Sequence, residues 1–393
     1  MRRRISAAML ACGIAAGCAF AQAPRAAGQL AEQRFKNVQL LKGISVQEFM
    51  ETMGFISAAT NMTCTVCHGE ASAGNWDRYA DDPPLKRKAR AMMVMVDGIN
   101  KANFGGVRRV TCYTCHRNAA VPKVTPTLAE QYATPLPEDP DDIFGQAPGA
   151  PTPDAILDKF LQALGGPAKA AALTSFIGKG KYEGYDDPDS SPVEIYAKAP
   201  GQFAQINHSG AGDRVTVDDG RSGWIAQAES EVPVPVVTLA GGDLQGLHLE
   251  AQLFFPGRIK QLFTDLHVGF PLSGALAILP DRTGSGIDER ELVVMQGKTA
   301  VGGVKVKLYF EKESGLLVRM VRFTNLPYGF ITTEMDYADY RDVGGFKIPH
   351  RITKTWVDGR SVVSLDSVQV NVPVDASKFN KPEAPKEPAG AKK

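Results

Sequence analysis

Two amphipathic helices are predicted in the first third of the chain. The first covers about 46–60, where apolar side chains recur at the spacing of one helix face. The run before it, Ser45-Val46-Gln47-Glu48, has the pattern of a capping box, and Asn61 marks the end of the helix. The apolar positions of this face are Phe49, Met50, Met53 and Ile56.

The second helix is predicted to begin at Asp82-Pro83, an N-cap aspartate followed by a proline in the first turn, and to run to about Asn100. Gly105-Gly106 then interrupts the chain. A short cysteine-containing segment follows each helix, so the arrangement of helix, turn and cysteine segment occurs twice. The apolar stripe of the second helix is Met92, Met95, Val96 and Ile99.

From Asp154 onward the pattern becomes that of a sheet. A short amphipathic helix over Asp154–Leu164 precedes many short β-type runs separated by turn signals. In Val304–Phe310 the apolar residues alternate with Lys305 and Lys307, which predicts a half-buried strand of an antiparallel sheet. A helical insertion is expected near 242–253. The other predicted strands cover 177–182, 193–197, 202–207, 214–217, 223–228, 291–294, 316–323, 331–337, 348–356 and 361–370.

The segment Val121–Pro153 is rich in proline and carries scattered acidic residues. This composition is typical of an extended, semi-stiff connection. We expect it to lie as a strap along the surface of the helical region; the alternative is a spacer between two domains. Residues Lys381–Lys393 have the composition of a disordered tail.

The N-terminus predicts export. Met1-Arg2-Arg3-Arg4 is a positive region, the residues from Ile5 to about Gly17 are apolar or small, and Ala19-Phe20-Ala21 fits a cleavage site. The alternative is lipidation at Cys18, which follows small residues as in a lipobox. The net charge of +1 gives no electrostatic reason to expect a nucleic-acid partner.

Four of the six cysteines form two C-x-x-C-H motifs: Cys64, Cys67 and His68, then Cys112, Cys115 and His116. This is the pattern for covalent attachment of c-type haem. Two thiols at this spacing reach the vinyl groups on one edge of a porphyrin, and the histidine beneath the ring binds the iron. A four-cysteine zinc site would need the two pairs only about 15–20 residues apart, and a disulfide framework would not need the histidines.

The sixth iron ligand has several candidates. Between residues 22 and 150 the only histidines are His68 and His116, so a second histidine would have to come from the β region: His208, His248, His267 or His350. These four are scattered without ligand spacing. Methionine is the simpler choice, although methionine on an apolar helix face usually fills space. The methionine candidates are Met50, Met53, Met62, Met92, Met93 and Met95.

The runs 49–53, 89–95 and 110–117 together resemble the cytochrome subunit of photosynthetic reaction centres and related two-haem cytochromes. In that family a helix methionine before each motif binds the iron from the far side. The resemblance covers about residues 35–122 and implies Met53 for the first haem and Met92 for the second, with Met50 and Met95 as the next choices. The tetrahaem subunit has two further motifs that this chain lacks.

Histidine–methionine ligation has two consequences. Thioether sulfur favours ferrous iron and so gives a comparatively high potential, and a six-coordinate iron has no open position for a substrate. Both favour an electron carrier over an enzyme. An iron with one open position, able to bind small ligands or react with peroxide, is the alternative.

The β region resembles the half-open barrel of periplasmic lipoprotein carriers and localisation factors. The runs 308–310, 315–319 and 336–341 carry this resemblance. In that family the concave face holds acyl chains, which implies a lipid or acyl ligand. A sheet filled by its own side chains would instead be a structural or docking module.

The sequence therefore predicts a multidomain protein: an α-helical cytochrome domain, then an α+β domain with a large curved antiparallel sheet. The predicted order is a signal peptide over 1–21, the dihaem domain over 22–120, the linker over 121–153, the β domain over 154–380 and the tail over 381–393. We expect two covalent haem c groups, membrane-associated redox partners, and a location in the periplasm or on the outer face of the cytoplasmic membrane. The alternative function is a lipid- or lipoprotein-binding β domain with a redox-sensing haem module.

Replacing Met53 or Met92 by alanine should lower the potential of the corresponding haem, because the variant loses the sulfur ligand that stabilises ferrous iron. Axial ligands span about 0.8 V of potential, so a decrease of roughly 0.1 V or more is expected in a redox titration. An unchanged potential in both variants would show that neither methionine binds iron.

Overall fold

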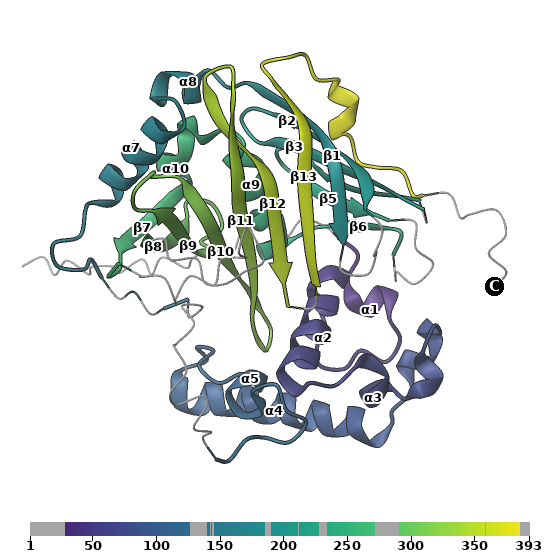
Figure 1. Ribbon diagram of the computed structural model, residues 1–393. Helices are drawn as coiled ribbons and strands as arrows, with labels where there is room; N and C mark the ends of the chain where they lie inside the picture. The colour runs from purple at the N-terminus through teal and green to yellow at the C-terminus, as the bar shows by residue number, and fades with distance from the viewer. Residues whose placement is uncertain are drawn as a thin grey trace, which may run out of the picture.

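The computed structural model describes residues 28–125, 140–141, 143, 145–184, 190–210, 212–227, 234–271, 291–357 and 359–385. The predicted signal peptide, Cys18, most of the linker's first half and the last eight residues lie outside this set. Figure 1 shows the two parts of the chain: helices of the N-terminal region below, and a large curved sheet above. The fold class predicted from the sequence is confirmed.

The N-terminal part is helical. Its elements are α1 (Ala31–Arg34), α2 (Val46–Thr60), α3 (Cys64–His68), η1 (Glu70–Ser72), η2 (Trp76–Ala80), α4 (Pro84–Phe104) and α5 (Cys112–His116). The hydroxyl of Ser45 accepts a hydrogen bond from the Glu48 amide at 3.1 Å, and Asn61 ends α2 in the left-handed conformation. The predicted bounds of the first helix are therefore confirmed.

The second helix differs from its prediction at both ends. Pro83, not Asp82, is the N-cap of α4, and the Asp82 carboxylate instead pairs with Arg90 at 2.7 Å. The helix continues past Asn100 to Phe104, where Gly105 takes the left-handed conformation. Asn100 does not stop the helix because its buried side chain accepts hydrogen bonds from the amides of Arg109 and Val110.

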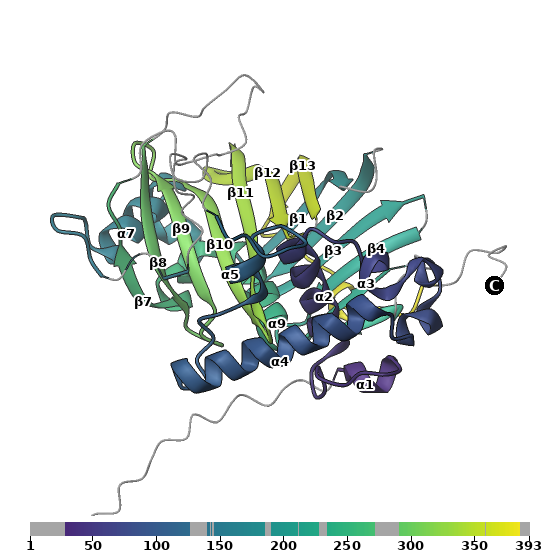
Figure 2. The same ribbon diagram turned by 90° about the horizontal axis from the view of Figure 1, so that it is seen from below.

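The buried stripe of α4 is also shifted from its predicted position. Met93 and Val96 are buried, whereas Met95 is 50% exposed and Met92 is half-buried. Figure 2 shows α4 running along the underside of the molecule. Its Met93 and Val96 pack in the apolar cluster that contains Tyr328.

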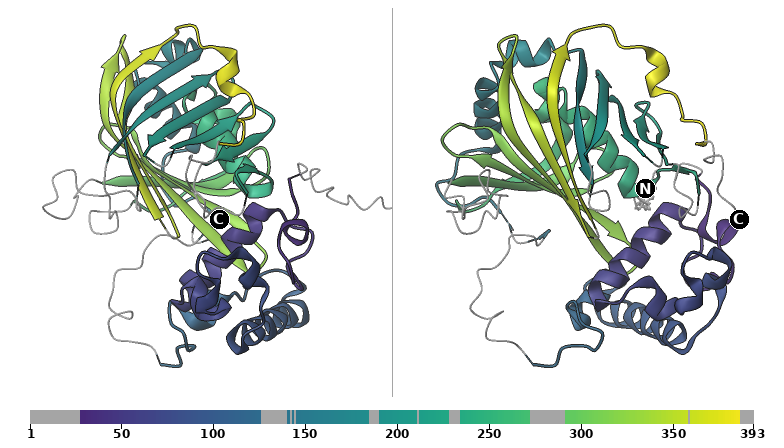
Figure 3. Two further views of the ribbon diagram at one scale, coloured as in Figure 1. Left: turned by 90° about the vertical axis from the view of Figure 1, so that its right-hand side faces the viewer. Right: turned by 45° about the vertical axis from the view of Figure 1, so that its right-hand side comes forward.

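In the second part, the described residues form one antiparallel sheet of thirteen strands, ordered β6-β5-β4-β3-β2-β1-β13-β12-β11-β10-β9-β8-β7. It is open and strongly curved (Figure 3). Every strand predicted from the sequence is present. The strands are β1 (Ser175–Gly184), β2 (Ser191–Lys198), β3 (Gln202–Ser209), β4 (Gly212–Asp218), β5 (Gly223–Ala226), β6 (Val236–Thr238), β7 (Phe263–Val268), β8 (Leu292–Thr299), β9 (Lys305–Glu311), β10 (Leu317–Leu326), β11 (Gly329–Val343), β12 (Phe346–Trp356) and β13 (Gly359–Val370).

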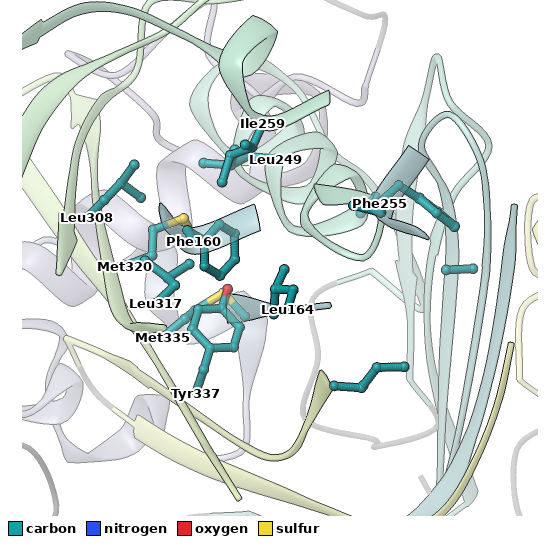
Figure 4. Packing of buried hydrophobic residues seen from close by; sticks show 14 of the residues in the cluster. Phe160, Leu164, Leu249, Phe255, Ile259, Leu308, Leu317, Met320, Met335 and Tyr337 are labelled. Carbon is teal, nitrogen blue, oxygen red and sulfur yellow. The ribbon is translucent and has the colours of Figure 1, made fainter. Parts of the chain in front are cut away.

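Helices cover the concave side and one end of this sheet. They are α7 (Pro153–Ala163), α8 (Pro167–Ala171), α9 (Gly241–Leu253) and α10 (Ile259–Leu262), with the short turn η3 (Pro256–Arg258). The turn η5 (Ala376–Phe379) lies on the opposite face, where Phe379 packs on Tyr196 and Val217. Phe160 and Leu164, at the end of α7, pack with Leu249 of α9 against Met320 and Tyr337 of the strands (Figure 4). The helices predicted over 154–164 and 242–253 are thus confirmed.

Two expectations for the sheet's other face were wrong. Lys307 does alternate with the apolar residues of β9, but it is fully buried instead of facing solvent. The linker starts on the helical region, where the Lys123 amide donates to the Cys115 carbonyl at 3.0 Å. The strap prediction is wrong for the later stretch, which lies on the sheet: Asp141 pairs with Lys305 at 2.5 Å, and the Ile143 amide donates to the Gln296 side chain. Isoleucine 143 also packs on the small apolar cluster of this face.

The β10–β11 hairpin joins the two parts. Phe55 of α2 packs against Leu326 and Ile331 of the hairpin, and a side chain at Gly329 would collide with the Phe55 ring. Next to it, Tyr328 is buried in the cluster that contains Met93 of α4. The hairpin tip is therefore enclosed by the helices.

Replacing Phe55 by alanine should lower the free energy of unfolding by about 3–5 kcal/mol, because it leaves a cavity between α2 and the hairpin. Phe104, 41% exposed on α4, is the matched control, and its alanine variant should change the stability by about 0.5 kcal/mol or less. Guanidinium denaturation measures both. Equal losses in the two variants would contradict the described interface.

Candidate functional site

Both cysteine motifs form single helical turns that end at the histidine. In α3 the chain leaves His68 through Gly69, whose φ of +89° suits glycine. In α5 the Thr111 hydroxyl caps the turn by accepting from the Thr114 amide. All four cysteines are free thiols, with Cys64 and Cys115 exposed. The thiols are therefore available for bonds to a bound group.

The two histidines are oriented in the same way. The Nδ1 atom of His68 lies 3.2 Å from the Tyr79 carbonyl oxygen, and that of His116 lies 2.9 Å from the Ala119 carbonyl oxygen. A carbonyl can only accept, so Nδ1 carries the proton and the Nε2 lone pair is left free for a metal. Burial lowers the pKa of His68, which further favours the neutral, ligating form.

A cavity lies between α2 and the first motif. Its lining brings Cys64, Cys67 and His68 together with Met53 and with apolar residues of α2 and α4. Two thiols, an imidazole and a thioether sulfur around an apolar space form the donor set of a histidine–methionine haem c. The residues present therefore fit the group that the first motif predicts.

The methionines differ in their positions around this cavity. Met53 lines it from α2, and Met50, one turn earlier, lines both this cavity and a larger one beyond α2. Met62 lies on the cysteine side, with its sulfur 3.9 Å from the Cys67 sulfur. Met93 lines the cavity but is buried in the apolar cluster of the helices.

The second motif lies against the first helix. Helix α5 packs on α2, and α3 packs on α4, so each motif touches the helix that precedes the other motif. His116 is buried, and burial raises the pKa of the Cys112 thiol to about 11. The side chain of Cys112 meets Phe55 and Leu326 of the interface. Met92 lies half-buried on α4.

The β-region histidines have local roles in the sheet. His248 shares a 2.6 Å contact with the buried Asp218 carboxylate, and His208 a 2.8 Å contact with Asp213. The His350 ring contacts the Ile348 carbonyl. In each of these three contacts the ring uses Nδ1, which orients the imidazole within the β region.

Among the described residues, three cations border the first cavity: Lys36, which pairs with Asp77 at 2.7 Å, and Lys86 and Arg90 of α4. Lys86 donates to the carbonyl oxygens of Tyr79 at 2.6 Å and Asp81 at 2.9 Å, and Arg90 pairs with Asp82. Burial lowers the pKa of Lys86. Cations in this position suit the carboxylates that a haem carries on its periphery.

A larger cavity of about 510 Å³ lies between α2 and the concave face of the sheet. Its lining includes Glu51 of α2, Asp243 of α9, and the three buried or half-buried groups Glu250, Arg322 and Lys354. Sequence reasoning missed this cluster. Each residue is an ordinary charged position in its own element, and no spacing along the chain indicates that they meet.

The cluster contains two carboxyl groups in contact. Burial, and then the negative charge of Asp243, raise the pKa of Glu51 well above its usual range, and burial also raises that of Asp243. Glu250 behaves differently: burial alone would raise its pKa, but Lys354 and Arg322 hold it below the ordinary value. Lys354 contacts both Glu250 oxygens at 2.9 Å.

Comparison with known proteins supports the predicted resemblance of the helical region. The model of the family described as photosynthetic reaction centre cytochrome C subunit matches residues 13–136. The photosynthetic reaction center cytochrome c subunit of Thermochromatium tepidum is 39% identical over 101 residues, 24% of this chain and 24% of that protein. The subunit from Rubrivivax gelatinosus (strain NBRC 100245 / IL144) is 36% identical over 101 residues, 24% and 26% of the two chains. The chain thus spans about a quarter of the length of these relatives.

Some solved structures are similar to part of this chain. The LolA superfamily protein NE2245 from Nitrosomonas europaea aligns with 59% of this chain and 99% of its own, at 14% identity and a TM-score of 0.38. A DUF1329 family protein from Desulfovibrio piger aligns with 58% and 96%, at 7% identity and a TM-score of 0.38. Within the described residues, no helix is long and apolar enough to cross a membrane.

Replacing Lys86 by glutamine should lower the potential of the first haem and leave the second nearly unchanged, because a cation stabilises the more reduced centre. Coulomb's law gives ~1–2 kcal/mol for unit charges about 10 Å apart at an effective dielectric constant near 20, which corresponds to roughly 40–90 mV. Lys101, exposed in the last turn of α4, is the matched control. A redox titration showing the same shift in both variants would contradict this role.

Proposed function

We propose that the protein is an exported dihaem c-type cytochrome that carries electrons between a membrane oxidoreductase and a second redox protein. The observation that carries the proposal is the repeated site: two C-x-x-C-H turns, each with its histidine Nδ1 held by a backbone carbonyl. A photosynthetic reaction centre and a respiratory complex both suit as the membrane partner.

Each residue of the two sites has a defined task in this proposal. Cys64 and Cys67 hold one haem and Cys112 and Cys115 the other. His68 and His116 are the proximal ligands, and Met53 and Met92 the distal ones. When bound, the haems supply a one-electron redox couple at each site.

The protein's own contribution is to exclude water from the haem site and to hold the ligating side chains in place. The apolar lining from α2 and α4 excludes water around the first iron, and the carbonyls of Tyr79 and Ala119 fix the imidazole rings. A site that changes little between its two oxidation states exchanges electrons without rearranging the chain. These features favour a carrier over an enzyme.

The proposed domain order is the signal peptide over 1–21, the cytochrome domain over 22–120, the linker over 121–153, the β domain over 154–380 and the tail over 381–393. The periplasm, or the outer face of the cytoplasmic membrane, is the proposed location. Cleavage after Ala21 gives a free protein, and lipidation at Cys18 gives an anchored one.

A second candidate function rests on the 510 Å³ cavity of the β region. A space of this size and apolar lining suits a lipid or acyl ligand. In this alternative, the β domain binds a lipid or lipoprotein, and the haem module senses the redox state.

The reduced protein should not bind carbon monoxide, because both irons are six-coordinate in the proposal. The Met53→Ala variant should gain one binding site per molecule, seen as a shift of the Soret band. Met62→Ala is the matched control, since Met62 lines the same cavity from the cysteine side and should leave the iron closed. Carbon monoxide binding to the unmodified protein would instead support an iron with an open position.

A further inference from the structure

The larger cavity has an apolar body. Its volume of about 510 Å³ lies within the range of small-molecule sites. The walls come from α7, α9 and the concave face of the sheet, and include Phe160, Phe176, Phe203, Ile225, Leu247 and Phe254. The sheet is therefore not filled by its own side chains, and an apolar ligand body has room here.

One end of the cavity carries an unused hydrogen-bond donor. Arg322 of β10 is 93% buried and lines the cavity. Its two terminal nitrogens reach Thr324 at 2.8 Å and Glu250 at 3.4 Å, but its buried Nε has no hydrogen-bond partner among the described residues. A buried donor without a partner is costly, so this end of the cavity suits a ligand oxygen that accepts a hydrogen bond.

The charges around this donor favour a neutral ligand. Arg322 and Lys354 face three carboxyl groups, those of Glu51, Asp243 and Glu250. The cluster thus has no surplus positive charge with which to bind an anionic head group. The buried Oε2 of Glu51 also has no donor among the described residues, so it can accept a hydrogen bond from a ligand hydroxyl.

The cavity and the first haem site share a wall. Met50 lines both spaces, and Met53, the proposed iron ligand, lies one turn further along α2. Glu51 projects into the larger cavity from the same helix. A ligand head at the Arg322 end therefore lies on the other side of one helix from the haem site.

We propose that this cavity binds a quinol with an apolar tail and that the bound quinol reduces the haems. This inference rests on the proposed electron-carrier function. A ring oxygen accepts from Arg322 Nε and a ring hydroxyl donates to Glu51, while the tail occupies the apolar body. Each quinol loses two electrons, one to each of two ferric haems, and two protons, which pass to water; quinone leaves.

Binding is tested on the oxidised holoprotein with the oxidised probe, a benzoquinone carrying a ten-carbon tail, by calorimetric titration. No electron transfer occurs between these two forms, so the titration reports binding alone. We expect one site per molecule and about tenfold weaker binding in Arg322→Lys, which keeps the charge toward Glu250 but loses the Nε–H. Arg319→Lys is the matched control, because Arg319 is an equally buried arginine of β10 that pairs with Asp336 and does not line the cavity.

A second variant tests the tail site without touching the charged cluster. Ile225→Phe fills part of the apolar body from β5, and it should weaken binding of the quinone while the circular dichroism spectrum and haem content stay unchanged. Equal affinity in all four proteins, or no binding to the unmodified protein, would overturn the proposal.

Electron transfer is tested by stopped-flow mixing of the oxidised holoprotein with the corresponding quinol under anaerobic conditions. Haem reduction should saturate with quinol concentration and slow in Arg322→Lys at subsaturating quinol, while reduction by ascorbate stays equal in all variants. Binding without haem reduction would remove the redox step. A monoacylglycerol that binds as tightly as the quinone would assign the cavity to a neutral lipid instead, and failure of ascorbate to reduce the protein would mean that the electron-carrier function itself is wrong.

Discussion

Helix α2 is the element on which the rest of the structure depends. Its Phe49–Met53–Ile56 side belongs to the apolar cluster of the helices and borders the first motif, while Phe55 packs on the β10–β11 hairpin. Glu51 enters the larger cavity between these two faces. One helix thus carries a proposed iron ligand, the domain contact and part of a second site. A shift of α2 by one residue would displace all three together.

The contact between the two parts combines close packing with buried charge. Apolar packing at Phe55 and Tyr328 stabilises the contact, whereas the carboxyl and cationic groups near Glu51 are costly to bury. Lys354 and Arg322 offset this cost for Glu250, whereas burial raises the pKa of both carboxyl groups in the contacting pair of Glu51 and Asp243. Such groups are retained at a contact when they fix its geometry or take part in function. Because the cluster lies beside the proposed haem site, we favour a functional role for its charged groups.

Local signals predicted much of the molecule. The Ser45 cap and the left-handed Asn61 are short-range features, so the sequence alone gave the bounds of α2. The C-x-x-C-H spacing located two helical turns, and the residues of the first, Cys64, Cys67 and His68, line a cavity. Runs of β-type residues bounded by turn signals located the predicted strands, because both signals are local. The strands β6 and β7 were not predicted.

The features that sequence reasoning missed depend on contacts between distant segments. Lys307 is fully buried, which no pattern within β9 reveals. The linker follows β8 and β9 through Asp141 and Ile143, a choice set by partners some 150 residues away. The stripe of α4 shifted to Met93 and Val96 because the Tyr328 hairpin, not the motif alone, sets its buried face.

The central claim is that the two motifs hold two histidine–methionine haems. The intact mass and the optical spectrum of the protein, expressed with periplasmic haem maturation, test it most directly. The account predicts the mass of the chain plus two covalent haems, and a weak sulfur-to-iron charge-transfer band in the oxidised spectrum. A mass without haem, or two haems without that band, would contradict it.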